Sequence, residues 1–245
     1  MKSPKRARNP PADIGRHDSR NAHRKTTRPA PPLRRTRDGA AVLVVGASGS
    51  GKTAWTLRQI PAGAPVLVWD CTTEWGGRLN LIVCRSAQHL AELIIADMRG
   101  ELTYPFRVGC SWPVTAEHFE AFCKLAWVWI RSRRGNHLVI EELADVTSPA
   151  KAPAAWGEIC RKNRYRGGRV FALTQRPAES DKTILGNCAV IHCGRMNTAR
   201  DRRYMAECLD VPLEDVTGLQ DLEYIERDMR THAVRRGVVQ FTRQT

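Results

Sequence analysis

Residues 46–53 have the types and spacing of a phosphate-binding loop. They read G-x-x-x-x-G-K-T and follow directly after the apolar run Ala41-Val42-Leu43-Val44-Val45. Glycines let consecutive backbone N–H groups turn toward phosphate oxygens, and the helix that follows points the positive end of its dipole at them. The pattern predicts a loop between a strand and a helix that binds a nucleoside triphosphate. The expected nucleotide-binding residues are Gly46, Ser48, Gly49, Ser50, Gly51, Lys52 and Thr53.

Two side chains at the end of this loop predict the cofactors. Lys52 adds a mobile positive charge that can meet the β- and γ-phosphates. Thr53 supplies a hydroxyl for Mg²⁺, which bridges the phosphate oxygens and neutralises charge during transfer. We therefore expect ATP and Mg²⁺ as cofactors. The alternative interpretation of the same residues is a Gly- and Ser-rich hairpin without a ligand.

Carboxylates follow two other apolar runs. The run 137–140 ends in Glu141-Glu142, and the run 66–69 ends in Asp70. Ligands of open α/β sheets lie at the carboxyl ends of the strands, so these positions are candidates for chemistry. We expect Glu141 to hold the hydrated Mg²⁺ and Glu142 to act as the base on attacking water, unless both are solvated at a helix start. Asp70 either supports the water shell of the metal or caps a turn.

An amide follows a third apolar run. Residues 169–173 are followed by T-Q-R-P at 174–177, so that Gln175 comes directly after a buried strand. A glutamine amide can donate to a γ-phosphate oxygen and accept from the lytic water at the same time. Gln175 is therefore the candidate sensor of hydrolysis. The alternative is a turn opened by Pro177 that carries polar residues by default.

The charge of the chain is concentrated at one end. The total is +14 over 245 residues, and residues 1–38 hold 12 Lys and Arg against 3 Asp, or +9. This segment contains prolines and almost no large apolar residues, so we expect a disordered basic arm, followed by one ATPase domain at 39–245. We expect the positive charges of this arm to bind the phosphates of a nucleic acid. The alternatives are binding to an acidic partner or a lipid surface, a targeting address, or a tail that only increases solubility.

Composition places the chain among intracellular globular proteins. Apolar residues make up 42% of the sequence, which is enough for a substantial core. No apolar run approaches the roughly 20 residues of a membrane-spanning helix, and the basic start lacks the apolar segment of a signal peptide. The 8 cysteines form no C-x-x-C pair and are expected to be reduced and buried. A core strand is the favoured interpretation of residues 188–193. The alternative is a metal site that includes Cys188, His192 and Cys193.

Apolar runs alternate with helical patterns along residues 40–200. This order predicts an α/β fold with a mostly parallel sheet covered on both faces. The expected strands are 41–45, 66–69, 106–110, 137–141, 169–173 and 188–193, and the expected helices are 52–60, 87–98, 116–131 and 154–164. A charged helix from Asn197, an acidic segment around 213–228 and a final strand at 238–241 complete the prediction.

With these motifs in place, the chain resembles the FtsK–HerA superfamily of DNA-pumping ATPases over about residues 40–200. Residues 46–53 match the P-loop, 138–142 look like the second acidic motif, and 173–177 look like the T-Q-R-P sensor strand of FtsK-type motors. The family usually has Asp-Glu where this chain has Glu141-Glu142. The short length makes the chain most similar to the genome-packaging ATPases of membrane-containing viruses with double-jelly-roll capsids, including tectivirus-like phages.

The resemblance implies a RecA-like core, a ring that is often a hexamer, and double-stranded DNA as the moving substrate. It also implies an ATP site completed by an arginine of the neighbouring subunit. By position relative to the T-Q-R-P strand, Arg195 resembles that arginine, and Arg164 and Arg166 come next. Packaging proteins at a capsid vertex or in a viral membrane are the implied partners, and the host cytoplasm or the virion vertex is the implied location.

Two other functions are compatible with a P-loop. A small-molecule kinase would need a mobile lid with arginines, for which the cluster at 161–169 is available. Such an enzyme has less need of a water-activating Glu142 or a sensing Gln175. A nucleotide-switched adaptor on DNA or membrane would use the arm for contacts and ATP only to change conformation.

Overall fold

The computed structural model describes residues 39–133 and 135–240, with Arg166 as backbone only. The expected arm at 1–38 lies outside the described residues. Within the described part of the chain, no helix combines the length and apolarity needed to cross a membrane.

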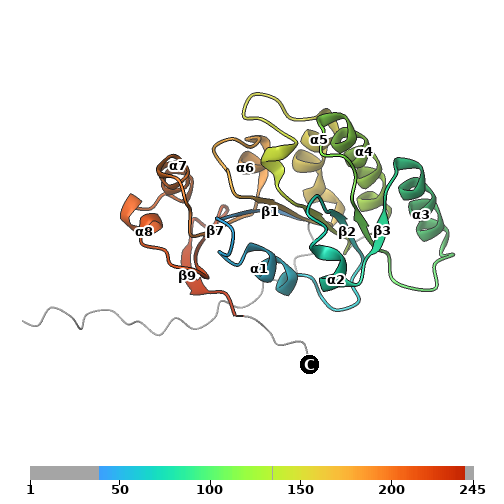
Figure 1. The fold of residues 1–245 in the computed structure, drawn as a ribbon, viewed down its shortest axis with the longest axis horizontal. Helices are drawn as coiled ribbons and strands as arrows, with labels where there is room; N and C mark the ends of the chain where they lie inside the picture. The colour runs from blue at the N-terminus through green and yellow to red at the C-terminus, as the bar shows by residue number, and fades with distance from the viewer. Residues whose placement is uncertain (1–38, 134, 241–245) are drawn as a thin grey trace, which may run out of the picture.

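One mixed sheet runs through the described residues (Figure 1). Its order is β3-β4-β2-β5-β6-β1-β7-β8-β9; the first seven strands along the chain are parallel, and β8 and β9 are antiparallel additions at one edge. The strands are β1 Ala40–Val45, β2 Val66–Trp69, β3 Ile82–Cys84, β4 Arg107–Cys110, β5 His137–Ile140, β6 Arg169–Thr174, β7 Val190–Gly194, β8 Glu223–Asp228 and β9 Val234–Val238. The predicted α/β class with a mostly parallel sheet is confirmed.

Helices cover both faces of this sheet, so the central strands are apolar on both sides. In Figure 1, α1 and α2 lie on one face, where they pack Trp55 and Trp75 against the strands. The longer helices α3, α4, α5 and α7 bury their apolar stripes on the other face. The helices are α1 Lys52–Gln59, α2 Trp75–Leu79, α3 Ala87–Arg99, α4 Ala116–Ser132, α5 Ala154–Lys162, α6 Thr183–Asn187, α7 Ala199–Leu209 and α8 Leu213–Thr217, with 3-10 turns η1 Leu143–Asp145 and η2 Asn163–Arg166.

Aromatic side chains dominate the larger core. Phe122 of α4 is fully buried, with its ring centroid 5.2 Å from Trp69, 6.1 Å from Trp112 and 6.3 Å from Phe119. The contacts with the two tryptophans are edge-on, the favourable geometry for aromatic pairs. This cluster fixes α4 over the strand that ends at Asp70.

The differences from the predicted elements have simple causes. β3 is only three residues long and α2 contains Gly76-Gly77, so neither gives a periodic signal. A final strand is present, but the bounds predicted for it, 238–241, are wrong at the start, because pairing with β8 selects Val234–Val238, which includes Arg235 and Arg236; residue 241 lies outside the described residues. Arg236 forms an ion pair with Asp215 on α8, so a charged residue is accommodated in this edge strand.

Replacing Phe122 by Ala should remove the centre of the aromatic cluster. We expect a loss of about 3–5 kcal/mol in the free energy of unfolding, measured by urea denaturation, because a large cavity would remain. Val128→Ala is the control, since this side chain on the same helix is 47% exposed and should cost less than about 0.5 kcal/mol. Equal losses in the two variants would contradict the described packing of α4.

Candidate active site

Three neighbouring strands bring the predicted motifs together. β5, β6 and β1 are adjacent and parallel, so the residues after each strand meet at one edge of the sheet. A cleft of about 350 Å³ opens there, within the range of small-ligand sites. It is lined by Ser48, Gly49, Gly51, Lys52, Thr53, Ala54, Thr72, Glu74, Arg78, Glu141, Glu142, Asp145, Leu173 and Gln175.

The loop after β1 keeps the start of α1 open to an anion. Gly51 precedes the helix with φ 93°, and a Cβ there would lie 3.1 Å from Val239, so only glycine fits. Among the described residues, no side chain caps α1, which is also true of α2, α5, α6 and α8. The first backbone N–H groups of α1 therefore remain available as phosphate donors.

Lys52 lies half-buried at the floor of the cleft. Its Nζ donates to the carbonyl oxygens of Gly46, at 2.8 Å, and Ala47, at 3.0 Å. Burial lowers the pKa of Lys52, and the carboxylates of Glu142 and Glu141 counteract this effect. The ammonium group is thus held inside the loop at the position where a phosphate would lie.

Glu141 is the buried acid of the cleft. Its Oε2 accepts a hydrogen bond from the Thr72 hydroxyl at 2.7 Å and a longer one from the Thr72 backbone N–H at 3.4 Å. Burial raises the pKa of Glu141, the Thr72 hydroxyl lowers it, and the nearby Asp70 carboxylate raises it further. With Thr53 across the cleft, the available groups are oxygens, which fits the ligand preference of Mg²⁺.

Asp70 lies behind Glu141 and does not line the cleft. Burial raises the pKa of Asp70, and its buried Oδ1 has no hydrogen-bond partner among the described residues. No side chain among the described residues caps the start of α2, so the turn-capping alternative for Asp70 stays a prediction. The metal role predicted for Asp70 stays a prediction.

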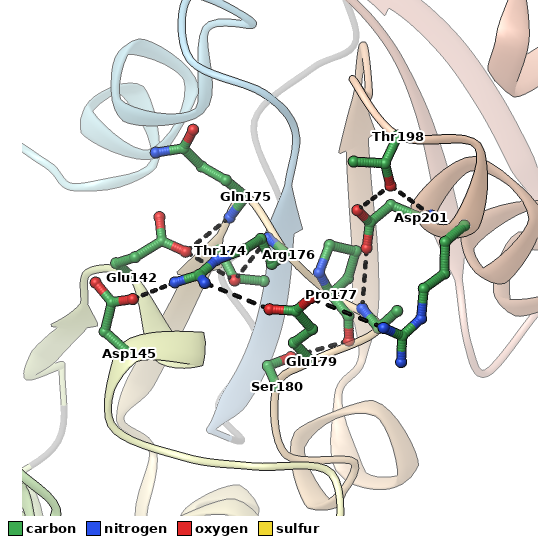
Figure 2. A network of polar contacts seen from close by, with 12 residues as sticks. Glu142, Asp145, Thr174, Gln175, Arg176, Pro177, Glu179, Ser180, Thr198 and Asp201 are labelled. Carbon is green, nitrogen blue, oxygen red and sulfur yellow. Dashed lines mark hydrogen bonds and ion pairs between the residues drawn. The ribbon is translucent and has the colours of Figure 1, made fainter.

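Glu142 and the predicted sensor strand are in direct contact. The Glu142 Oε1 accepts hydrogen bonds from the Thr174 hydroxyl and from the backbone N–H of Gln175, each at 3.0 Å (Figure 2). Among the described residues, no hydrogen bond reaches Oε2 of Glu142, so this oxygen is available to a water molecule. The Gln175 side chain lines the same cleft, and the roles of base and sensor stay predictions.

Arg195 lies beside the loop of its own chain. Its guanidinium donates to Asp221 at 2.6 Å, to Asn197 at 2.7 Å and to the carbonyl oxygen of Ser48 at 3.4 Å. The Arg195 carbonyl also accepts from the backbone N–H of Ala47 at 2.7 Å. These contacts brace the loop from outside the cleft, and the role in a neighbouring subunit stays a prediction.

Most of the predicted site residues line the cleft, and four additional polar side chains join them. Gly46 and Ser50 do not line it; the Ser50 side chain is buried against Gly46. Thr72, Glu74, Arg78 and Asp145 line the cleft although no role was predicted for them. Thr72 and Glu74 follow β2, so the rule that selected Glu141 would also have selected them. Arg78 is carried by α2, a helix without a sequence signal.

Cys188, His192 and Cys193 are buried parts of the core, and the His192 imidazole contacts Glu226 at 3.0 Å. Within the described residues, no group of three His, Cys, Asp or Glu side chains is arranged to hold a metal ion.

Comparison with known proteins identifies the family. No protein-family model matches the sequence. Protein P9 of Pseudoalteromonas phage PM2 is 35% identical over 181 residues, which cover 74% of this chain and 79% of protein P9. This chain belongs to the family of protein P9.

Solved structures confirm the fold of this P9 family member. The genome packaging NTPase B204 from Sulfolobus turreted icosahedral virus 2, in complex with ATP-gammaS, has a TM-score of 0.66 and 15% identity over 80% of this chain and 96% of its own. B204 from Sulfolobus turreted icosahedral virus, described as a DNA-packaging ATPase, has a TM-score of 0.65 and 14% identity over 82% and 98%. The bacterial conjugative coupling protein TrwBdeltaN70 has a TM-score of 0.58 and 12% identity over 83% and 86%.

Replacing Glu141 by Gln should stabilise the P9 family member at neutral pH. Because burial raises the pKa of Glu141, its ionised form destabilises the folded state once the pH exceeds that pKa. The amide keeps an oxygen for Thr72 but carries no charge. We expect a higher free energy of unfolding than wild type at pH 8, and a difference that shrinks as the pH falls toward 4. Urea denaturation across this range measures it.

The exposed Glu92 of α3 provides the control, because Glu92→Gln should leave the pH profile of stability unchanged. A difference between wild type and Glu141→Gln that is constant from pH 8 to 4 would contradict the raised pKa.

Proposed function

We propose that this chain is an ATP-driven translocase of double-stranded DNA that packages a viral genome into a preformed capsid. The observation that carries the proposal is the contact of Glu142 with Thr174 and Gln175 at the mouth of a phosphate-binding loop. An acid that activates water and is hydrogen-bonded to a sensor strand is suited to an enzyme that couples ATP hydrolysis to movement. Membership of the P9 family and the B204-like fold, known from a genome packaging NTPase, support the viral role.

Hydrolysis follows from the positions of the side chains. The N–H groups at the start of α1 and the Lys52 ammonium bind the β- and γ-phosphates. Glu142 takes the proton of the attacking water through its free oxygen, and the Gln175 amide orients that water against the γ-phosphate. Thr53 and Glu141 would hold Mg²⁺, with Thr72 orienting Glu141. When bound, the ion neutralises charge on the phosphate oxygens.

The structure weakens the kinase alternative. The arginine cluster at 161–169 precedes β6, whereas the cleft lies after the other end of β6. A lid must close over the cleft of its own chain, and this cluster lies at the opposite edge of the sheet. The same position suits contact with a neighbouring subunit, as expected in a ring.

Arg164 is the better candidate for the arginine that acts across a subunit interface. Arg195 makes its hydrogen bonds within its own chain, beside its own loop. The Arg164 guanidinium lies over the ring of Tyr165, which is 72% exposed, and makes no ion pair with any described residue. An exposed arginine at the edge far from its own cleft can reach the γ-phosphate of a neighbour. The side chain of Arg166 is outside the described residues.

The proposed assembly is a ring, with a hexamer as the expected size. Double-stranded DNA is its moving substrate, and the basic arm at 1–38 contributes phosphate contacts. Capsid-vertex or membrane-embedded packaging proteins are the proposed partners, in the host cytoplasm or at the virion vertex. A nucleotide-switched adaptor remains the second alternative to be tested.

Phosphate release by the purified chain, with and without double-stranded DNA, tests the function. We expect DNA to raise the rate. Lys52→Ala should abolish ATP binding, whereas Glu142→Gln should bind ATP and lose about 10²–10⁴-fold in kcat, because only the base is removed. Glu101→Gln, at an exposed site outside the cleft, is the control.

Each contrary result selects a different account. Normal hydrolysis by Glu142→Gln would place the base elsewhere. A rate that responds to a small-molecule acceptor but not to DNA would favour a kinase, and slow turnover under all conditions would favour an adaptor.

Mixing two inactive variants tests the shared site. In a ring of Glu142→Gln and Arg164→Ala chains, some sites receive an intact base from one chain and an intact arginine from the next. We expect recovery of about a quarter of the wild-type rate if chains mix at random. A mixture of Glu142→Gln and Arg195→Ala should stay inactive, because both side chains serve their own subunit. Recovery only in the second mixture would assign the arginine across the interface to Arg195.

A further inference from the structure

The segment between β6 and α6 is clamped beside the catalytic acid. At its start, Thr174 and Gln175 donate to Glu142. Arg176 then forms ion pairs with Asp145, at the end of η1, and with Glu179 (Figure 2). The Arg176 backbone N–H donates to the Thr174 hydroxyl at 3.1 Å. The position of Gln175 therefore depends on how this segment, residues 174–180, is held.

A buried carboxylate on α7 holds the other side of the segment. The Asp201 Oδ1 accepts a hydrogen bond from the backbone N–H of Ala178 at 3.2 Å, and its Oδ2 accepts from the Thr198 hydroxyl (Figure 2). Thr198 is the N-cap of α7 and accepts in turn from the Asp201 N–H at 3.0 Å. Asp201 thus holds the hydroxyl of the N-cap residue of α7 and also contacts the segment after β6.

Comparison with the other capped helices shows that capping alone does not require this arrangement. The caps of α3 and α4, Ser86 and Thr115, accept from the N–H groups of His89 and His118. Both histidines occupy the position of Asp201 in their helices, and neither is buried: His118 is exposed and His89 is half-buried. In α7 the equivalent side chain is buried and turned toward Ala178. A buried carboxylate needs hydrogen-bond donors, and Ala178 supplies one from outside the helix.

We propose that Asp201 is a positioning residue for ATP hydrolysis. By fixing Ala178 it holds residues 174–180, so that Gln175 lies in the cleft and Thr174 stays against Glu142. Pro177 lies between the two anchored positions, and its ring fixes its φ angle. The backbone between Ala178 and Gln175 therefore has little freedom to absorb a shift at Ala178, and the shift reaches Gln175. The inference rests on the proposed hydrolysis. Because Asp201 lies on α7 and holds Ala178, this helix is the element that moves with residues 174–180.

The test separates this contact from helix capping. Asp201→Ala should lower kcat about tenfold while KM for ATP changes less than about twofold, because a misplaced sensor affects the reaction more than binding. Asp201→Asn should recover most of the rate, since its amide oxygen can accept from Ala178. Thr198→Ala removes the cap but leaves the Ala178 contact, so it should lose stability like Thr115→Ala on α4 and keep wild-type kcat.

Hydrogen exchange in residues 174–180 of the full chain provides a second readout that needs no activity. Asp201→Ala should speed exchange in this segment, and Thr198→Ala should not. Unchanged kcat and exchange in Asp201→Ala, or an equal loss of kcat in Thr198→Ala, would overturn the inference. A wild-type chain that hydrolyses no ATP would refute the proposed function, and the exchange data alone would then decide whether Asp201 holds the segment.

Discussion

The two hydrogen bonds that Glu142 accepts from the sensor strand fix the geometry on which the site depends. They join the end of β5 to the end of β6, and β6 lies directly beside β1, which leads into the phosphate-binding loop. Glu142 adopts a left-handed backbone conformation with φ 45°, which costs about 1–2 kcal/mol for a residue with a Cβ. The contact with Thr174 and Gln175 offsets that cost and directs the carboxylate to the cleft.

The charges around this contact are arranged for ligand binding more than for stability. Burial raises the pKa of Glu141 and lowers that of Lys52, so each charged group is less favourable in the fold than in water. A triphosphate with its cation brings charges of both signs into the cleft, which match these groups. Sites that trade stability for function in this way are typical of enzymes.

Local sequence rules predicted the parts of this site that follow directly after strands. The phosphate-binding loop, Glu141, Glu142 and Gln175 all come at the carboxyl ends of apolar runs, and all but Gly46, Ala47 and Ser50 of the loop line the cleft. The rule gave no role to Arg78, because α2 carries two glycines and no helical period. It also missed Asp201, whose partner Ala178 is 23 residues away in the sequence and is brought near only by the packing of α7.

We infer that one edge of the sheet binds a triphosphate and hydrolyses it. A structure of the chain with Mg²⁺ and a non-hydrolysable ATP analogue tests this most directly. We expect the γ-phosphate within hydrogen-bond distance of Lys52 and of the Gln175 amide, with a water molecule between that phosphate and the free oxygen of Glu142. A triphosphate bound in the loop with its γ-phosphate turned away from both Glu142 and Gln175 would contradict it.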